Sequence, residues 1–285
     1  MTIDITLSSR AVSTKATELN DRDRIALAWF REIQPTIRRK LGRRQYVIRV
    51  HTHDTVAASH DRRCPGVDLC VAACAHRCAK GVLMIPDFDF LHTRGYADLK
   101  PDPYTYGAKK SRVFWRGAST GRVVGSPDRM CDNPRVRLCT LCQTIPGTNV
   151  RLSNIAQIRD IATKEAIRPL VDKRRPHADF LRSRVLIDID GNSNAWSSLF
   201  WKMRSNSVVL KVDTPYRQWY YHRMVAGRHY VPTSLDTLES KISWCFRNPA
   251  KCQIIARAAT KFTRGITYMN ESQKAARIII KALKK

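Results

Sequence analysis

The segment 185–206, VLIDIDGNSNAWSSLFWKMRSN, constrains the fold more than any other part of the chain. Its first residues are apolar and rich in β-branched side chains, as in a strand buried on both faces, and they end at a glycine. Small polar residues follow, and then four apolar side chains recur at the spacing of one helix face: Trp196, Leu199, Phe200 and Met203. The segment therefore predicts a strand, a glycine turn and a helix.

The turn from Gly191 to Trp196 is a candidate phosphate site. A turn between a strand and a helix leaves backbone N–H groups unpaired at the carboxyl edge of a sheet, beside the positive end of the helix dipole, and a diphosphate fits there. The segment contains neither a Walker lysine nor the full GxGxxG spacing. A plain strand-to-helix connection without a ligand therefore stays open as the alternative.

The rest of the chain also alternates between strand-like and helix-like patterns of apolar residues. With 285 residues, 43% of them hydrophobic, it can bury a substantial core, and its length suits two modest domains. Alternating strands and helices predict an α/β fold with parallel sheet. Strands are expected at 46–50, 81–86, 112–116, 184–190, 207–212 and 229–232. Helices are expected at 21–41 (interrupted by Pro35), 67–80, 134–143, 195–205, 216–224, 234–247, 249–264 and 270–284. Residues 1–20 are expected to be loosely ordered, 95–110 to form a loop, and 144–180 to be irregular.

The chain is strongly basic. Lys and Arg total 51 against 24 acidic residues, a formal net charge of +27, which favours polyanionic partners such as nucleic acid, acidic lipid or phosphorylated substrates. The basic residues are scattered, and no recognition helix, zinc finger or RNA-binding aromatic pattern is visible. A solvated basic surface is the simplest interpretation. A nucleic-acid-binding protein stays open as an alternative function, although no specific nucleic-acid partner is expected.

Nine cysteines are present, an odd number. Cys70, Cys74 and Cys78 follow one another at intervals of four, and a CxxC pair occupies 139–142. Neither spacing matches a usual zinc site, so buried thiols are favoured over zinc or a disulfide, and no metal ligand is assigned. The start of the chain lacks a signal-peptide pattern, and no run of about 18 apolar residues occurs. We therefore expect a cytoplasmic chain.

Three further motifs can carry chemistry. PDFDF at 86–90 places two carboxylates after a short strand, where one of them can act as a base. RVFWRGASTGR at 112–122 runs from a strand into an arginine and a small-residue turn, and DNPRVRLC at 132–139 begins a helix with a proline and an arginine. Each motif alone is weak, since paired surface aspartates and arginines are common.

Together, in this order, these motifs resemble glycosyltransferase family 90. The segment LIDIDGNSNAWSSLFWKMRSNSVVLKVDTPYRQWYYHRMVAGRHYVP and the closing SLDTLESKISWCFRNPAKCQIIARAATKFT extend the similarity over about residues 80–265. The family includes capsule-associated and lipopolysaccharide-modifying transferases and protein O-glucosyl and O-xylosyl transferases. The resemblance implies a GT-B fold, two Rossmann-like domains with parallel sheets facing a cleft. An acceptor-side domain would span 21–108, with 266–285 packing back on it, and a nucleotide-sugar-binding domain 109–265.

The resemblance also implies an activity. The chain would move glucose or xylose from a UDP-sugar to a hydroxyl of a glycan, lipid-linked saccharide, lipopolysaccharide, capsule or protein acceptor, with inversion and without a bound metal or cofactor. Arginines and backbone amides would neutralise the leaving diphosphate, and one carboxylate would take the acceptor's proton. An enzyme acting on lipid-linked glycans would benefit from peripheral contact with the anionic inner face of a membrane.

Carried over by motif, the family's base falls on Asp87, with Asp89 close enough to leave the choice open. The residues expected to bind the donor are Arg116, Gly117, Ala118, Thr120, Arg135, Gly191, Asn192, Ser193, Asn194, Ala195 and Trp196.

Two positions depart from the family pattern. Ala118 occupies a position where some members have serine, and Leu199 one where many have arginine, so Lys202 is a candidate replacement. The missing arginine keeps a catalytically inactive binding module open as an alternative. Among the aromatic residues 219–221, a ring can stack on the ligand or belong to the core, while His222 and His229 are expected to be structural or surface residues.

Overall fold

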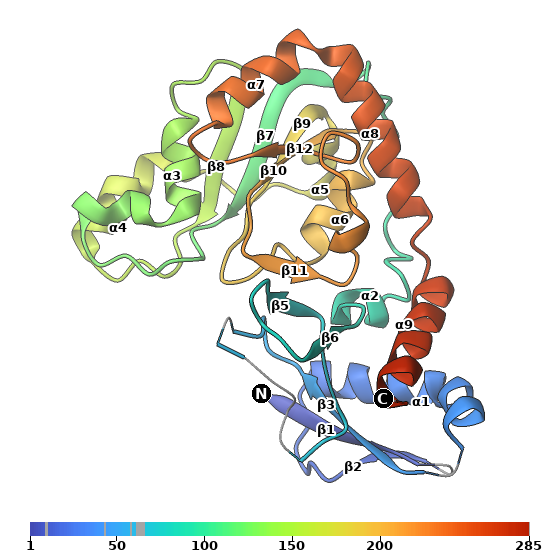
Figure 1. The fold of residues 1–285 in the computed structure, drawn as a ribbon. Helices are drawn as coiled ribbons and strands as arrows, with labels where there is room; N and C mark the ends of the chain where they lie inside the picture. The colour runs from blue at the N-terminus through green and yellow to red at the C-terminus, as the bar shows by residue number, and fades with distance from the viewer. Residues whose placement is uncertain (9–10, 43, 58, 61–65, 285) are drawn as a thin grey trace. The chain divides into compact units, whose positions relative to one another are not determined.

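The computed structural model describes residues 1–8, 11–42, 44–57, 59–60 and 66–284, which form two compact units (Figure 1). Unit 1 comprises Met1–Leu99, Pro215–Arg223 and Ile266–Lys285, and unit 2 comprises Lys100–Thr214 and Met224–Gly265. The chain thus changes unit after Leu99, whereas the expected boundary was 108. The segment Pro215–Arg223, expected in the nucleotide-binding domain, is part of unit 1.

Unit 2 is built on a sheet of five parallel strands in the order β12-β10-β9-β7-β8. Their bounds are β7 Lys110–Ala118, β8 Thr148–Asn154, β9 Ser183–Asp188, β10 Val208–Val212 and β12 Val231–Thr233. All five residues of β10 are buried, as expected of a central strand in a parallel sheet. The predicted strands at 112–116, 184–190 and 207–212 are confirmed.

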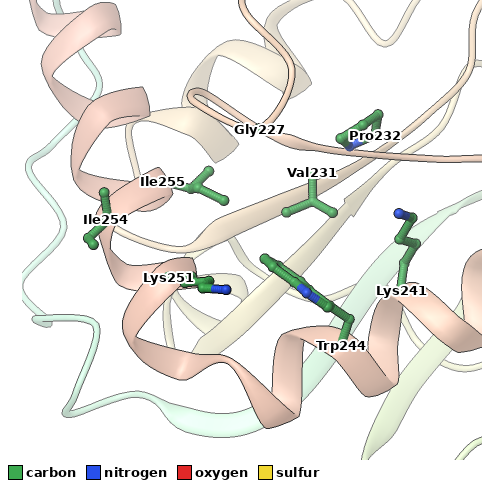
Figure 2. Close-up of a pocket in the computed structure, with 8 residues that line it drawn as sticks. All are labelled: Gly227, Val231, Pro232, Lys241, Trp244, Lys251, Ile254 and Ile255. Carbon is green, nitrogen blue, oxygen red and sulfur yellow. The ribbon is translucent and has the colours of Figure 1, made fainter.

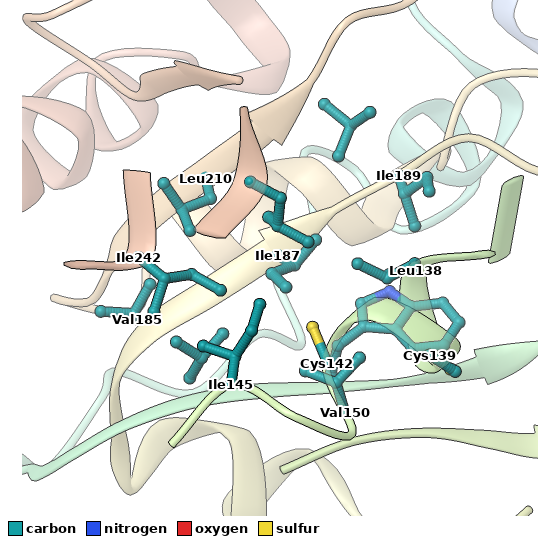
Figure 3. Close-up of a cluster of buried hydrophobic side chains, with 14 of the residues drawn as sticks. Leu138, Cys139, Cys142, Ile145, Val150, Val185, Ile187, Ile189, Leu210 and Ile242 are labelled. Atoms are coloured by element: carbon teal, nitrogen blue, oxygen red, sulfur yellow. The ribbon is translucent and has the colours of Figure 1, made fainter. Parts of the chain in front are cut away.

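Helices cover both faces of this sheet. α3 Pro134–Leu141, α7 Leu238–Arg247 and α8 Pro249–Arg264 contribute to the main core, part of which Figure 3 shows. α5 His177–Leu181 and α6 Ser197–Met203 supply aromatic side chains that pack with Phe114 and Leu186 on the other face. α4 Ile161–Ile167 and the 3-10 segments η1 Pro127–Asp132 and η2 Arg168–Leu170 complete the unit. Residues 144–180, expected to be irregular, therefore contain β8, α4 and α5.

Unit 1 contains a mixed sheet, not the parallel sheet that was expected. Its order is β2-β1-β3-β4-β6, with β1 Thr2–Leu7, β2 Val12–Thr14, β3 Tyr46–His51, β4 Leu69–Ala72 and β6 Val82–Met84. β1 runs antiparallel to β2 and β3, while β3, β4 and β6 are parallel. The connection from β1 to β2 is too short for a crossover, so these two strands can only pair antiparallel. The expectation of a loosely ordered start is therefore wrong.

Two long helices of unit 1 pack against each other: α1 Asp21–Leu41 and α9 Tyr268–Leu283. Asn20 begins α1 with a capping box that includes Asp23. The helix continues through Pro35, where an interruption was expected. Pro35 faces solvent, and the buried Ile33 and Ile37 hold the helix on either side of it, so the loss of one hydrogen bond is tolerated.

Two expected helices are strands. Residues 67–80 form β4 and β5 Cys74–His76, because Leu-Cys-Val-Ala is a buried strand sequence whose cysteine spacing only imitates a helix face. Residues 216–224 form β11 Tyr216–Gln218, which pairs antiparallel with β5, followed by the 3-10 turn η3 Tyr221–Arg223. In both cases pairing within unit 1 overrides the local pattern.

The cysteines are mainly buried thiols, as favoured from the sequence. Cys139 and Cys142, the CxxC pair, lie in the unit 2 core, and burial raises the pKa of each to about 12, so both stay protonated. Cys70 is disulfide-bonded, so one disulfide does form. The sulfur of Cys70 lies with ring nitrogens of His51 and His60 in a group whose atoms are all within 4.8 Å of one another. We assign no metal to this group, because a disulfide sulfur is not a thiolate ligand.

No helix in the described parts of the chain combines the length and the apolar character that a membrane crossing requires.

Candidate active site

A fully buried carboxylate follows β6. Asp87 is the N-cap of the short helix α2 Phe88–His92, and its Oδ1 accepts a hydrogen bond from the Phe90 amide at 2.9 Å. The Tyr96 hydroxyl lies 2.8 and 2.9 Å from the two carboxylate oxygens, and Trp219 Nε1 donates to Oδ2 at 3.1 Å. Asp87 is thus enclosed by three donors, all from unit 1.

Burial raises the pKa of Asp87, and the hydrogen bonds from Phe90, Trp219 and Tyr96 act in the opposite direction. Asp89, two residues later, has an exposed side chain. The structure therefore separates two aspartates that the sequence left equivalent, because Asp87 is buried and oriented by three hydrogen-bond donors, whereas Asp89 is exposed.

The aromatic residues near Asp87 belong to the interior of unit 1. Trp219 and Tyr220 are buried, and the Trp219 ring packs against Phe90 with centroids 4.7 Å apart. Trp219 therefore orients Asp87, a role that sequence reasoning missed. No local signal connects residues 87 and 219, which are 132 positions apart.

A second group of functional candidates lies in unit 2, at the carboxyl ends of β7 and β9. Arg135, in the first turn of α3, donates from Nε to the Asp190 carbonyl at 2.9 Å and from Nη2 to the Ile189 carbonyl at 3.2 Å. Its Nη1 donates to the Ala118 carbonyl at 3.1 Å and to the Thr120 hydroxyl at 2.7 Å. One guanidinium thus connects the turn after β7 to the turn after β9.

The two turns are in close contact. A Cβ atom at Gly191 would lie 2.6 Å from Thr120 Oγ1 and 3.0 Å from Arg135 Nη2, so only glycine fits there. The Gly121 amide donates to Asn192 Oδ1 at 3.2 Å. The structure therefore brings together the expected site residues Thr120, Arg135, Gly191 and Asn192.

The turn between Gly191 and Trp196 carries donors that no acceptor in the described part of the chain uses. Within the described residues, the backbone N–H groups of Ser193, Asn194 and Ala195 and the Nδ2 of Asn194 have no acceptor. Asn194 is only 3% exposed, and an amide buried there without a partner is costly. Trp196, with a φ of 45°, leads into α6, which lacks a side-chain cap. These donors can bind an anion.

A model of glycosyl transferase family 90 matches residues 98–274, more than half of the chain and including the unit 2 turns. The chain belongs to glycosyl transferase family 90. The O-glucosyltransferase LpsA of Dichelobacter nodosus is 28% identical over 167 residues, 58% of this chain and 46% of that protein. The uncharacterised protein 035R of Invertebrate iridescent virus 3 is 28% identical over 177 residues, 56% of this chain and 15% of that protein. This family 90 chain thus spans less than half the length of either relative.

Two solved structures are similar to this family 90 chain. TarM has a TM-score of 0.45 and 8% identity, covering 77% of this chain and 44% of that one. Anabaena Alr3699/HepE, in complex with UDP-glucose, has a TM-score of 0.44 and 12% identity, covering 75% of this chain and 64% of that one.

The side chain of Arg116, in the WRG motif, forms no hydrogen bond in the described residues to the turns after β7 and β9. Its buried guanidinium donates to the Asn149 carbonyl at 3.0 Å and to Asn149 Oδ1 at 2.6 Å, and it forms an ion pair with Asp172. Arg116 therefore joins β7 to β8. The neighbouring Gly117 is required by packing, since a Cβ there would lie 2.5 Å from the Trp115 ring.

Lys202 does not reach the turn in place of the missing family arginine. Leu199 is fully buried, and Lys202 Nζ lies 3.2 Å from Asp188 Oδ1, while Lys211 Nζ lies 3.5 Å from Asp188 Oδ2. Burial acts to raise the pKa of Asp188, but the two ammonium groups outweigh it and the pKa is lowered. The charge of Lys202 thus stabilises Asp188 at the end of β9.

The histidines have the structural or surface roles that were expected. His222 is exposed. His229 is buried, accepts from the Val225 amide at 3.0 Å and stacks on Phe262 with ring centroids 4.7 Å apart. Neither contacts Asp87 or the turns of unit 2 through any bond found in the described residues.

Proposed function

We propose that this family 90 chain is an inverting glycosyltransferase of GT-B type that moves glucose from UDP-glucose to an acceptor hydroxyl. Acceptors of the proposed class are glycans, lipid-linked saccharides, lipopolysaccharide, capsule or protein, and UDP-xylose is the alternative donor. Relatives named as O-glucosyltransferases support the choice of sugar. We also propose that the chain works at an anionic membrane face, because its net charge is +27 and lipid-linked saccharides belong to this acceptor class.

The observation that carries the proposal is the turn between Gly191 and Ala195. Arg135 and the absence of a side chain at Gly191 fix its backbone, and the unused donors of Ser193, Asn194 and Ala195 are available to a diphosphate. Donors that are already oriented stabilise developing negative charge without reorganisation. We therefore propose that the donor's diphosphate binds here and that no metal is required.

The proposed reaction is a single displacement. The acceptor oxygen bonds to the anomeric carbon of the sugar while the bond from that carbon to the UDP oxygen breaks, and UDP leaves with the electron pair. The acceptor's proton passes to the carboxylate of Asp87. Asp87 is 0% exposed, so an acceptor can reach it only when the Trp219 or Tyr96 side chain moves aside.

The test compares Asp87→Asn with Asp89→Asn. The asparagine at 87 keeps an oxygen for the Phe90 amide, so the variant is expected to fold, but it cannot take a proton. Transfer should fall by about 10²–10⁴. UDP binding, measured by calorimetry, should be unchanged, and Asp89→Asn should transfer as the wild type does, because Asp89 is exposed.

A second experiment measures transfer from a panel of UDP-sugars with and without EDTA. Equal transfer with and without the chelator is expected. Near-normal transfer by Asp87→Asn would show that another group is the base. UDP binding without transfer from any donor by the wild type would identify a binding module, and dependence on a divalent ion would refute the metal-independent mechanism.

A further inference from the structure

A pocket separate from the proposed donor site lies between α7, α8 and β12 (Figure 2). It has a volume of about 450 Å³ and is lined by Gly227, Val231, Pro232, Lys241, Trp244, Lys251, Ile254 and Ile255. None of these residues belongs to the turns that carry Arg135 and Gly191. The wall of the pocket is apolar except for two lysines.

The two lysines give this apolar pocket a positive edge. In Figure 2 the Trp244 ring projects from α7 towards Val231, and the ammonium groups of Lys241 and Lys251 lie on either side of it in this view. Among the described residues, neither lysine has an ion-pair partner, and no acidic residue lines the pocket. The pocket thus suits a molecule with an apolar part and a negative group.

The solvent face of α8 extends this character along the surface. Five of its exposed side chains recur at intervals of three or four residues, as on one helix face. They are Lys251, Ile254, Arg257, Lys261 and Arg264. The helix contains no acidic residue, and Ile254, 67% exposed, lies among the basic side chains.

We propose that this face of unit 2, the α7–α8 pocket together with the exposed row on α8, binds acidic phospholipid. An acyl chain or the glycerol region would occupy the apolar pocket, the phosphate would lie against Lys241 and Lys251, and the remaining basic side chains would face neighbouring headgroups. A polynucleotide would use the charges but leave Ile254 and the pocket without a partner, so lipid fits the combination better. The inference rests on the proposed membrane contact and is independent of the transfer chemistry.

Vesicle flotation of the full chain tests the proposal. Binding is expected to vesicles of phosphatidylcholine with phosphatidylglycerol, and not to phosphatidylcholine alone. Trp244→Ala combined with Ile254→Ser should weaken binding about tenfold, the loss expected from removing two apolar side chains that would contact the lipid. The matched control is Ile161→Ser on α4, since Ile161 is 75% exposed in the same unit and lies outside the pocket.

Charge is tested in the same assay. Lys251→Gln with Arg257→Gln should reduce binding to the acidic vesicles by about tenfold or more. Lys173→Gln with Arg174→Gln removes two exposed charges elsewhere in unit 2 and should have a smaller effect. UDP affinity, measured on every variant, should stay at the wild-type value. Retained UDP affinity would show that the fold and the donor site are intact.

Three outcomes would overturn the proposal. These are equal binding to neutral and acidic vesicles, equal losses in the matched controls, and tight binding of a duplex oligonucleotide that the α8 variants abolish while vesicle binding persists. The last result would assign the face to nucleic acid. Failure of UDP transfer with vesicle binding intact would refute the proposed transfer activity and leave this inference standing.

Discussion

Asp188, the last residue of β9, is buried and Asp190, two residues later, is partly buried, yet their pKa values shift in opposite directions. Two lysine ammonium groups near Asp188 keep its pKa below the usual value despite burial. Asp190 has the Thr214 hydroxyl as a partner and no ion pair in the described residues, and burial raises its pKa from 3.8 to about 6. The fold therefore stabilises the charged form of Asp188 and destabilises the charged form of Asp190 at neutral pH.

The pH dependence of the free energy of unfolding should show that the charged form of Asp190 is destabilised. Because the pKa of Asp190 is raised in the folded state, its contribution to stability is present below about 3.8 and is lost as the pH rises through about 6. Asp190→Asn should therefore become more stable relative to the wild type as the pH rises from about 4 to 7, by up to about 3 kcal/mol. Urea unfolding at both pH values measures the difference.

Asp188→Asn is the control for this prediction, with the opposite sign. A lowered folded pKa contributes stability at neutral pH that is lost on acidification, so this variant should lose most at neutral pH. If both variants shift the free energy of unfolding equally at all pH values, neither carboxylate has the charge state described.

At the scale of elements, the junction of the two turns in unit 2 depends on a missing side chain. Gly191→Ala would place a methyl group 2.6 Å from Thr120 Oγ1 and 3.0 Å from Arg135 Nη2. Four hydrogen bonds hold the Arg135 guanidinium, so it cannot move aside cheaply. We expect a loss of stability of about 1–3 kcal/mol. UDP binding should weaken about tenfold, because the turn is displaced.

Gly125→Ala is the matched control, since a Cβ there meets nothing within 4 Å. Calorimetric titration with UDP and thermal unfolding of both variants check the prediction. An alanine at 191 that binds UDP like the wild type would show that the turn does not contribute to the donor site.

The strands β7, β9 and β10 and the helices α3, α6, α7 and α8 of unit 2 could be predicted because their signals are local, whereas β8, α4 and α5 lie in a stretch expected to be irregular. The apolar run from Val185 to Ile189 is typical of a strand buried on both faces. The spacing of apolar residues after it is typical of a helix buried on one face, and both patterns are visible in the sequence alone. The cysteine spacing at 70–78 fits both a helix face and two short strands, and only pairing with β3, β6 and β11 decides between them. The same limit applies to the site. The WRG motif identifies Arg116 as a candidate, but the direction of its side chain is determined by Asn149 and Asp172, which lie far from it in the sequence.

At the scale of the whole molecule, unit 1 consists of three separate segments. Trp29 Nε1 donates to Ser272 Oγ at 3.1 Å, and Arg223 forms two hydrogen bonds of 2.9 Å with the buried Glu271. The Gly95 backbone packs on Tyr268. α9 therefore holds α1, the Asp87 region and the Pro215–Arg223 segment together.

Deletion of residues 266–285 should consequently affect the two units unequally. Unit 1 loses the partners of Trp29 and Arg223, so the position of Asp87 is no longer fixed and transfer should fall by about 10² or more. Unit 2 keeps its sheet and turns, so UDP affinity should stay close to that of the full chain. Arg277→Gln with Lys281→Gln, on the exposed side of α9, should change neither. Equal loss of both properties would show that the units fold as one.

The interleaving of segments also restricts how such a chain can be recombined. Any single crossover between residues 30 and 271 joins the Trp29 of one parent to the Ser272 of another, and a crossover between 88 and 218 does the same for Asp87 and Trp219. Hybrids of distant relatives would thus inherit mismatched halves of one interior, while exchange of a whole unit requires several breakpoints at once. Natural variation in this lineage should accumulate by point substitution more readily than by shuffling.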